Sequence, residues 1–336
     1  MAAEALRIAT YNPELTRAGP GLLLQAIRKR NDPQVQAVVT VLARLDADVL
    51  LLTGIDYDYG QDAIRALAED LAEAGASYPY RRALRPNTGV QTGLDLDGNG
   101  AVGQARDAQG FGRFAGSAGM AILSRYPLGE ARDFSGLLWR TLPGADLPPD
   151  MSDAAKDVQL LSTAGHYDVA LTYAPGKALH LLVWYATPPV FDGPEDRNGR
   201  RNADEAAFWL HLLAGDLPWP PPPAPFVVMG QPNLDPVDGD GQHRSIAALM
   251  ALPALQDPHP KGADGHVDKG QRGNPAEDTA FYPKGVGGLR VDVILPGAGI
   301  PVTAAGVLAL PPQDAFAATL AAASRHRPVW AVLNLP

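Results

Sequence analysis

Side chains that could carry out chemistry stand where apolar runs end, and the stretch FVVMGQPNLDP at 226–236 illustrates this. Its run FVVM at 226–229 predicts a buried strand that stops at a glycine, a common way for an α/β enzyme to place a catalytic residue at a sheet edge. The residue placed there is Gln231. A glutamine side chain neither accepts a proton from a nucleophile nor brings negative charge to a metal ion. The chemistry therefore lies elsewhere in the chain or has been lost.

A second group of candidate ligands lies in the stretch DLDGNG, which begins at Asp95. Asp95, Asp97 and Asn99 alternate before a glycine, as the first ligands of a calcium loop do. The twelfth position of such a loop, normally acidic, is Arg106 here, although Asp107 follows it. Calcium is therefore a cofactor that the sequence suggests, and a plain turn, which Asp-Gly runs also form, is the alternative.

The elements that must position these side chains are strands and helices that alternate along the chain. Amphipathic helices lie between the strand-like runs, and 33–45 and 61–75 show clear apolar stripes. This pattern predicts packed sheets with helices outside. We expect one domain over 1–336, with a long glycine-rich loop at 86–118 and a proline-rich connector at 218–225. The strand-like runs are 6–12, 48–56, 119–126, 166–171, 178–187, 226–230, 289–295 and 327–335.

The composition bounds the partners and the compartment. The formal net charge of −9 over 336 residues argues against broad, charge-driven binding to nucleic acid, because phosphate contacts rely on clustered lysines and arginines. The absence of cysteine excludes disulfides and thiolate chemistry. No apolar stretch reaches the ~18 residues of a membrane helix. We therefore expect a soluble chain, either cytoplasmic or, if a signal segment has been removed, periplasmic or secreted.

Five motifs occur in a defined order: ATYN (9–12), DVLLLTGID (48–56), GQPNLDP (230–236), LRVDVIL (289–295) and SRHRPVW (324–330). In this order they resemble the endonuclease/exonuclease/phosphatase superfamily, which includes apurinic-site endonucleases, pancreatic-type deoxyribonucleases and inositol-phosphate phosphatases. The resemblance implies a four-layer α/β sandwich, in which two mostly antiparallel mixed sheets lie face to face with helices outside. It also implies hydrolysis of phosphoesters in nucleic acid or small molecules, with Mg²⁺ or a similar divalent cation held by carboxylates and an Asp-His pair.

Five residues match catalytic positions of that family. Asn12 ends the first strand, where an amide can hold a phosphate oxygen or a neighbouring carboxylate. Tyr185 stands where the family has His or Tyr, and Asn233 matches the asparagine of the G-D-x-N motif. Asp292 matches the aspartate of the x-D-x-I strand, and His326 matches the histidine of the closing S-D-H motif. These matches imply that the polar framework of the centre is retained.

Three acidic positions of the family pattern hold other residues. Gly54 stands where the metal-binding glutamate belongs, Gln231 replaces the aspartate that orients the nucleophile, and Arg325 replaces the aspartate before the closing histidine. Together these changes move the formal charge of the site by about +4, so that a divalent cation is poorly held. Without its aspartate, His326 is expected to have no fixed orientation. Arg325 and Gln231 would instead suit the binding of a phosphate or another anion without metal.

Displaced carboxylates offer an alternative. Glu14 lies two residues after Asn12, and Asp56 lies two residues after Gly54 on the same face of an extended strand, so either could hold a metal in place of the lost glutamate. The leading hypothesis is a member of the family with a depleted centre that is catalytically impaired and binds an anionic ligand. The alternative is an active metal-dependent phosphodiesterase, nuclease or phosphatase that uses such carboxylates. A third hypothesis is a secreted interaction scaffold whose long loops bind protein or polysaccharide.

Overall fold

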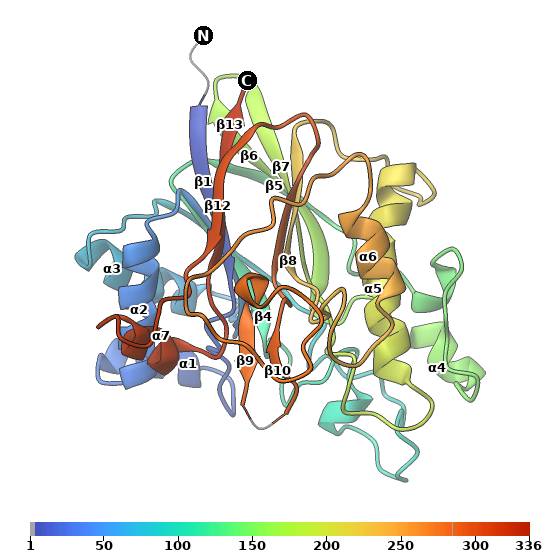
Figure 1. Cartoon of the computed structure of the whole chain (residues 1–336). Coiled ribbons are helices and arrows are strands. Elements are labelled where there is room, and N and C mark those ends of the chain that lie inside the picture. Colours follow the sequence, from blue (N-terminus) through green and yellow to red (C-terminus); the bar gives the residue numbers. More distant parts are fainter. Residues whose placement is uncertain (1–3, 284) are drawn as a thin grey trace.

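The strands form two large sheets and one small hairpin (Figure 1). The computed structural model of the chain describes residues 4–283 and 285–336. One sheet has the order β12-β13-β1-β2-β4-β3, the other has the order β11-β8-β7-β6-β5, and β9 pairs with β10. The bounds are β1 Glu4–Tyr11, β2 Val49–Ile55, β3 Tyr80–Leu84, β4 Gly119–Ser124, β5 Leu128–Asp133, β6 Gly165–Ala174, β7 Lys177–Tyr185, β8 Phe226–Gln231, β9 Ala280–Tyr282, β10 Gly287–Leu289, β11 Val293–Pro296, β12 Val302–Val307 and β13 Val329–Leu335.

Parallel pairing sets the geometry of the sheet edges. Only β1 with β2 and β7 with β8 run parallel among the strand pairs that the structure describes, and the remaining pairs are antiparallel. Both sheets are therefore mostly antiparallel and mixed, as predicted. The carboxyl ends of two parallel strands lie at the same edge, so β1 and β2 deliver their following residues together, and so do β7 and β8.

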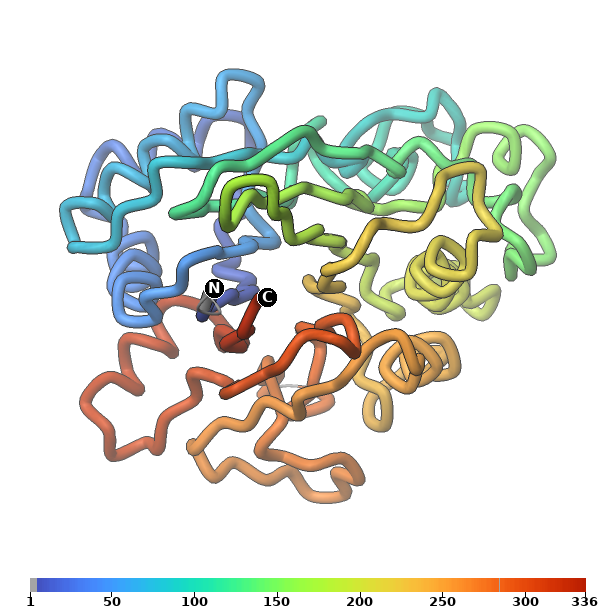
Figure 2. The backbone as a smooth tube through the Cα atoms, turned by 90° about the horizontal axis from the view of Figure 1, so that it is seen from above, coloured from blue at the N-terminus to red at the C-terminus, as the bar shows by residue number. Residues whose placement is uncertain are grey.

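Helices cover the outer face of each sheet. In Figures 1 and 2 the helices α1, α2, α3 and α7 flank the first sheet, whereas α5 and α6 flank the second. The α2 helix starts where Asp32 caps it, because the Asp32 carboxylate accepts from the amide N–H groups of Gln34 and Val35. The bounds are α1 Leu22–Lys29, α2 Pro33–Leu45, α3 Asp62–Glu73, α4 Asp153–Val158, α5 Arg197–Ala214, α6 Arg244–Met250 and α7 Ala317–Ala323.

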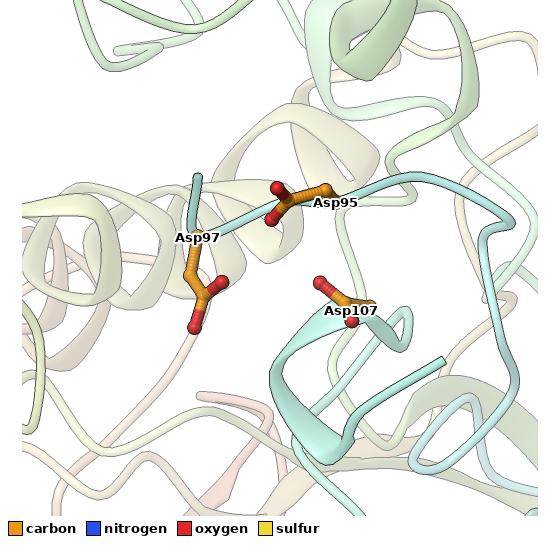
Figure 3. A group of neighbouring side chains, drawn as sticks. All are labelled: Asp95, Asp97 and Asp107. Atoms are coloured by element: carbon orange, nitrogen blue, oxygen red, sulfur yellow. The ribbon is translucent and has the colours of Figure 1, made fainter. Parts of the chain in front are cut away.

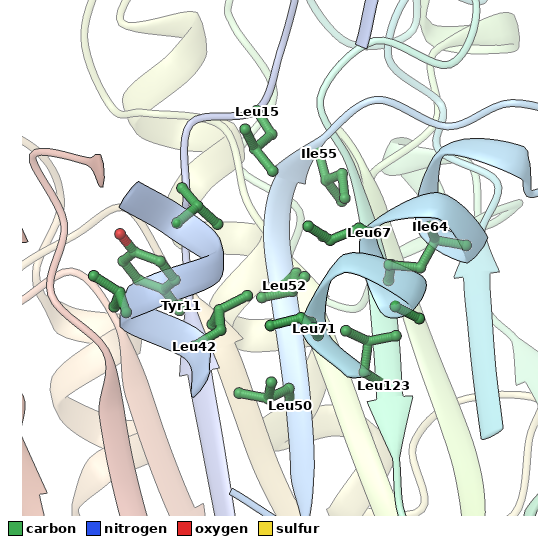
Figure 4. Packing of buried hydrophobic residues seen from close by; sticks show 14 of the residues in the cluster. Tyr11, Leu15, Leu42, Leu50, Leu52, Ile55, Ile64, Leu67, Leu71 and Leu123 are labelled. Atoms are coloured by element: carbon green, nitrogen blue, oxygen red, sulfur yellow. The ribbon is translucent and has the colours of Figure 1, made fainter. Parts of the chain in front are cut away.

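Three apolar clusters hold these layers together. The central cluster lies between the sheets and joins residues such as Ile8 and Leu51 of the first sheet to Val183 and Met229 of the second. A second cluster packs helices α1, α2, α3 and α7 on the first sheet (Figure 4), and a third packs α5 and α6 on the second. Every residue of β2 is buried, which explains the apolar run at its start, residues 49–52. The result is the predicted four-layer α/β sandwich.

The glycine-rich segment 86–118 folds as an irregular loop tied to the rest of the chain. Its Gln109 donates from Nε2 to the carbonyl of Val158 at 2.7 Å and accepts at Oε1 from the amide of Leu160 at 2.8 Å. A Cβ atom at Gly89 would come within 1.8 Å of the carbonyl oxygen of Phe114, so the loop packs closely on itself. None of the helices formed by the described residues is long and apolar enough to cross a bilayer.

Candidate functional site

Gln231 links the edges of the two sheets. Its Oε1 accepts from Nδ2 of Asn12 and from Oγ1 of Thr53, both at 2.8 Å, and its Nε2 donates to Oδ1 of Asn233 at 2.6 Å. Asn233 in turn donates from Nδ2 to the carbonyl of Ala186 at 2.7 Å. The glutamine is 2% exposed, so these contacts satisfy its amide group in a buried place. The predicted residues Asn12, Gln231 and Asn233 thus form one uncharged chain of amides.

Gly54 leaves no room for the side chain that the family pattern has at this position. It lies at an irregularity in the pairing of β2 with β4, and its φ of +60° is a left-handed conformation that suits glycine. A Cβ atom built there would meet Oδ1 of Asn12 at 2.3 Å. The Asn12 side chain therefore occupies the space that a side chain at position 54 would need. The neighbouring Thr53 supplies the side chain that reaches Gln231.

Arg325 is held by Glu14. The Arg325 guanidinium donates from both Nε and Nη2 to Oε1 of Glu14, with the Nε bond at 2.7 Å, and the Arg325 amide donates to Oε2 at 2.8 Å. Burial alone would raise the pKa of the Glu14 carboxyl, but the hydrogen bonds and charge of Arg325 lower that pKa below its ordinary value. Glu14 thus neutralises the charge that we expected Arg325 to offer to an anion. The excess positive charge expected from the substitutions is correspondingly reduced.

His326 has a carboxylate partner, so the expectation that it lacks a fixed orientation was wrong. Its Nδ1 lies 2.9 Å from Oδ2 of Asp292, which also accepts from Oγ1 of Thr279 at 2.9 Å. Asp292 is fully buried and His326 is 3% exposed. Oδ1 of Asp292 has no hydrogen-bond partner among the described residues. The partner of the histidine is Asp292, which lies between β10 and β11 and not within the single strand 289–295 expected from the sequence. The loss of an aspartate at position 325 therefore leaves the pair intact.

Two tyrosines complete the wall of the centre. Burial, with a further contribution from Asp292, raises the pKa of Tyr185 to about 12, while contacts with Asn12 and Asn233 act in the opposite direction. Tyr185 therefore keeps its phenolic proton at neutral pH. The Tyr282 ring lies 6.3 Å from the His326 ring, and the guanidinium carbon of Arg325 lies 5.4 Å from the Tyr282 ring centre. Burial raises the pKa of Tyr282 as well.

Asp56 supports loops rather than this centre. Its Oδ2 accepts from the amide of Arg17 at 2.8 Å, and its Oδ1 accepts from the amide of Ala118 at 3.1 Å. It is 8% exposed, and burial raises its pKa above the ordinary value of an aspartate. Among the described residues, Glu14, Asp56 and Asp292 do not belong to any group of three acidic or histidine side chains close enough to share a metal ion.

A divalent cation does not fit the centre as the side chains stand. Acidic ligands are needed to hold such an ion, yet Gly54 has no side chain and Glu14 already binds a guanidinium. The unpaired Oδ1 of Asp292 is one carboxylate oxygen, which does not make a site by itself. The contacts leave a centre of amides, phenols, the Glu14–Arg325 ion pair and the Asp292–His326 pair.

Asp95, Asp97 and Asp107 form a separate acidic group in the glycine-rich loop (Figure 3). One oxygen of each carboxylate lies within 4.8 Å of the others. Buried Asp107 accepts from the amides of Leu96 and Gln104, at 2.9 and 2.8 Å, so it closes the loop and brings a third carboxylate to the group from one position beyond Arg106. Asn99 donates from Nδ2 to Asp97 at 3.1 Å, which makes it a neighbour of this group.

The sequence did not indicate three further residues that contact the centre, Thr53, Thr279 and Tyr282. Thr53 binds Gln231, Thr279 binds Asp292, and Tyr282 lies beside His326. Thr53 was the one with a usable signal, because it directly precedes Gly54 in a motif already singled out. Tyr282 lies in a three-residue strand with no periodic pattern, and the short strand reaches the site because Ala280 pairs with His326.

Comparisons with known proteins identify the family and the fold. A model of the Endonuclease/Exonuclease/phosphatase family matches residues 24–326. The fold is similar to that of an endonuclease/exonuclease/phosphatase from Beutenbergia cavernae DSM 12333, with 19% identity and a TM-score of 0.53 over 98% of this chain and 72% of that one. It is also similar to a protein of the same family from Leptotrichia buccalis C-1013-b, with 13% identity and a TM-score of 0.55 over 97% and 98% of the two chains.

A third similar structure is sphingomyelinase C from Streptomyces griseocarneus, with 16% identity and a TM-score of 0.52 over 98% of this chain and 100% of that one. Identities this low show a common fold and leave the chemistry to be argued from the side chains. A search of curated proteins found no match.

Proposed function

Because the chain belongs to the endonuclease/exonuclease/phosphatase family, we propose that it is a member whose hydrolytic centre is impaired and binds a phosphate-containing ligand without a metal ion. Members of this family act on phosphoesters and nucleic acid and typically depend on a divalent metal. The observation that carries the proposal is the pair of contacts made by Gln231 and Arg325, which fill two of the acidic positions with a buried amide chain and an ion pair.

The uncharged hydrogen bonds of Gln231 support the proposed loss of hydrolysis. A water nucleophile needs a base close to it, and Gln231 cannot act as one. Its Oε1 already accepts twice, and its Nε2 donates to Asn233. A hydrolytic water would therefore have neither a base nor a metal at this position.

Donors that remain at the centre support phosphate binding. Tyr185 keeps its hydroxyl proton, and the Nη1 group of Arg325 donates to none of the described residues. Arg325 is 59% exposed at its side chain, so a ligand can reach it. Phosphate oxygens accept hydrogen bonds from such groups, and the planar guanidinium gives the contact direction although Glu14 offsets its charge. A small phosphate ester fits the acidic chain better than nucleic acid, because the formal net charge is −9.

An active hydrolase is the second candidate, and the Asp292–His326 pair favours it. The imidazole is oriented by a buried carboxylate whose other oxygen has no partner among the described residues. A histidine held in this way can exchange a proton with a substrate. This candidate requires that Glu14 leave Arg325, so that carboxylates become available to a metal ion. Calcium at Asp95 and Asp97 stays a separate prediction.

Two measurements on the purified chain test these functions. Hydrolysis of p-nitrophenyl phosphate and bis(p-nitrophenyl) phosphate is followed with Mg²⁺, Mn²⁺ or EDTA, and binding of phenyl phosphate is measured by calorimetry in EDTA. We expect no turnover above buffer and measurable binding that Arg325→Ala weakens about tenfold. Arg30→Ala is the matched control, because Arg30 is similarly exposed and pairs with Glu73 on the helical side.

The opposite outcomes are equally clear. Metal-dependent turnover by the unaltered chain that His326→Ala abolishes would establish the hydrolase and refute the impaired centre. Absence of phenyl phosphate binding, or binding that Arg325→Ala and Arg30→Ala reduce alike, would refute the anion site.

A further inference from the structure

A large cavity adjoins the candidate centre on the side of Tyr185. Its volume is about 1020 Å³, at the upper end of the range of small-molecule sites. The glycine-rich segment 86–118, residues 148–155 and the first turn of α5 enclose it, and Tyr185 and Ala186 at the end of β7 form the wall shared with the centre. The amide chain and the ion pair of the centre do not use this space. Phosphate binding at the centre therefore does not explain the side chains that line the cavity.

Two exposed phenylalanines line the cavity. Phe111 is 64% exposed and Phe191 is 80% exposed. Phe191 has a φ of +74°, a conformation that is unfavourable for a bulky residue and persists only where neighbours fix it. Asn198 of α5 fixes it here, since its Nδ2 donates to the carbonyl of Val190 at 2.8 Å and its amide donates to the carboxylate of Asp192. The two bonds fix the chain on either side of Phe191, whose ring is exposed.

Phe111 is presented by an equally constrained loop. Gln109, two residues before it, is bonded to the backbone of Val158 and Leu160. After it, Gly112 packs so closely on Gly89 that a Cβ atom would come within 2.7 Å of the Gly89 amide nitrogen. Hydrogen bonds and close packing therefore hold the backbone that carries each of these two rings. Exposed aromatic faces held in this way suit stacking against a flat ligand face.

The charged groups of the cavity are of both signs. Five carboxylates line it against three guanidiniums. The carboxylates outnumber the guanidiniums, so the lining repels a polyanion. Hydroxyl groups match such a lining, because each one both donates and accepts hydrogen bonds. The charged residues are Asp95, Asp97, Asp150, Asp192, Glu195, Arg106, Arg197 and Arg201.

We propose that this cavity binds a sugar ring of a neutral saccharide. The apolar C–H face of the ring lies on Phe111 and Phe191, and its hydroxyl groups donate to the carboxylates around it. Arg197 and Arg201 already donate to groups of the protein, so they hold the wall of the cavity in place. This function goes beyond phosphate binding at the centre and does not rest on it, since a neutral saccharide carries no phosphate.

Saturation-transfer NMR with maltose, cellobiose, lactose and chitobiose tests the proposal on the whole chain, followed by titration of the best binder in EDTA. We expect at least one of these to bind. Phe111→Ala and Phe191→Asn, which keeps a residue tolerant of positive φ, should each weaken binding about tenfold or more. Tyr59→Ala is the matched control, because Tyr59 is a 93% exposed aromatic residue outside the cavity lining.

Failure would be unambiguous. No binding by any of the four saccharides at about 10 mM would overturn the proposal, because a dissociation constant above that concentration is too weak for a specific site. So would affinity that survives the Phe111→Ala/Phe191→Asn double change in a folded protein. Binding of tetramethylammonium without binding of any saccharide would assign the cavity to an organic cation instead. Loss of phosphate binding at the centre has no bearing on these outcomes.

Discussion

Nδ1 of His326 lies 2.9 Å from Oδ2 of Asp292, although the two residues are 34 positions apart in the chain. The pair is buried and is braced by Thr279, whose hydroxyl donates to the same carboxylate oxygen. A centre can therefore lose its neighbouring acidic positions and still keep an oriented histidine. We infer that the Asp292–His326 pair stabilises the fold in addition to any role in chemistry.

We expect the pair to stabilise the fold by a measurable coupling energy. In a double-mutant cycle, Asp292→Ala and His326→Ala should be less than additive by about 1–3 kcal/mol, because each single change leaves a buried polar partner unpaired. Urea unfolding of the four proteins measures this. Additive changes would show that the contact carries no stability. His180→Ala serves as a control for the loss of a less buried histidine, whose partner is Asp168.

Much of the fold could be predicted from the sequence because apolar periodicity reports burial directly. The run before Gln231 became β8, and the stripe at 33–45 became α2 with the same bounds. Contacts at the centre could not be predicted in this way. The partner of His326 depends on how β11 and the segment before β13 are placed, and nothing within a few residues of the histidine shows that placement.

The conformation at Gly54 shows the same limit. A missing glutamate is visible in the sequence, but the positive φ and the position of Asn12 against the glycine are properties of the folded backbone. The Glu14–Arg325 bond joins residues 311 positions apart, so its neutralising effect was equally hidden. Sequence patterns thus identified the positions, and the tertiary contacts decided what the side chains there do.

Acid should weaken the Glu14–Arg325 bond. The folded pKa of Glu14 lies below its unfolded value of 4.5, so its contribution to stability is present above that value and is lost as pH falls through the folded pKa. Glu14→Gln should lower the free energy of unfolding by about 1 kcal/mol near pH 7 and have a smaller effect at about pH 3.

Urea unfolding across pH measures this difference, and Glu73→Gln is the control. Glu73 also pairs with an arginine, but its side chain is 62% exposed, so solvent screens the pair and we expect a smaller change. An effect of Glu14→Gln that is independent of pH would contradict the assignment.

Calcium should raise the melting temperature if it binds the acidic group of the glycine-rich loop. Asp95 and Asp97 keep lone pairs beyond those used by backbone amides, so the expected ligand is a hard cation. Binding to the folded state alone should raise the melting temperature by a few degrees in millimolar Ca²⁺ relative to EGTA. Asp97→Asn should remove most of that rise. Identical curves in Ca²⁺ and EGTA would exclude the site.

Gly54 should resist replacement more strongly than other glycines with positive φ. Gly54→Ala adds a Cβ atom 2.3 Å from Oδ1 of Asn12, and moving Asn12 disturbs its bonds to Gln231 and to the amide of Glu14. We expect a loss of about 2–4 kcal/mol in unfolding free energy, part of it from the left-handed backbone. Gly75→Ala is the matched control, since Gly75 has a φ of +93° but nothing within 4 Å of the added atom, and about 1 kcal/mol is expected there.

The same geometry bears on restoring the family's acidic residues. We expect Gly54→Glu, Gln231→Asp and Arg325→Asp together to give little Mg²⁺-dependent hydrolysis of bis(p-nitrophenyl) phosphate, because a side chain at position 54 requires Asn12 and the backbone around it to move first. Circular dichroism and urea unfolding show whether the triple variant folds. Robust turnover by a folded triple variant would mean that the backbone adapts readily, and that the three substitutions alone account for the proposed loss of hydrolysis.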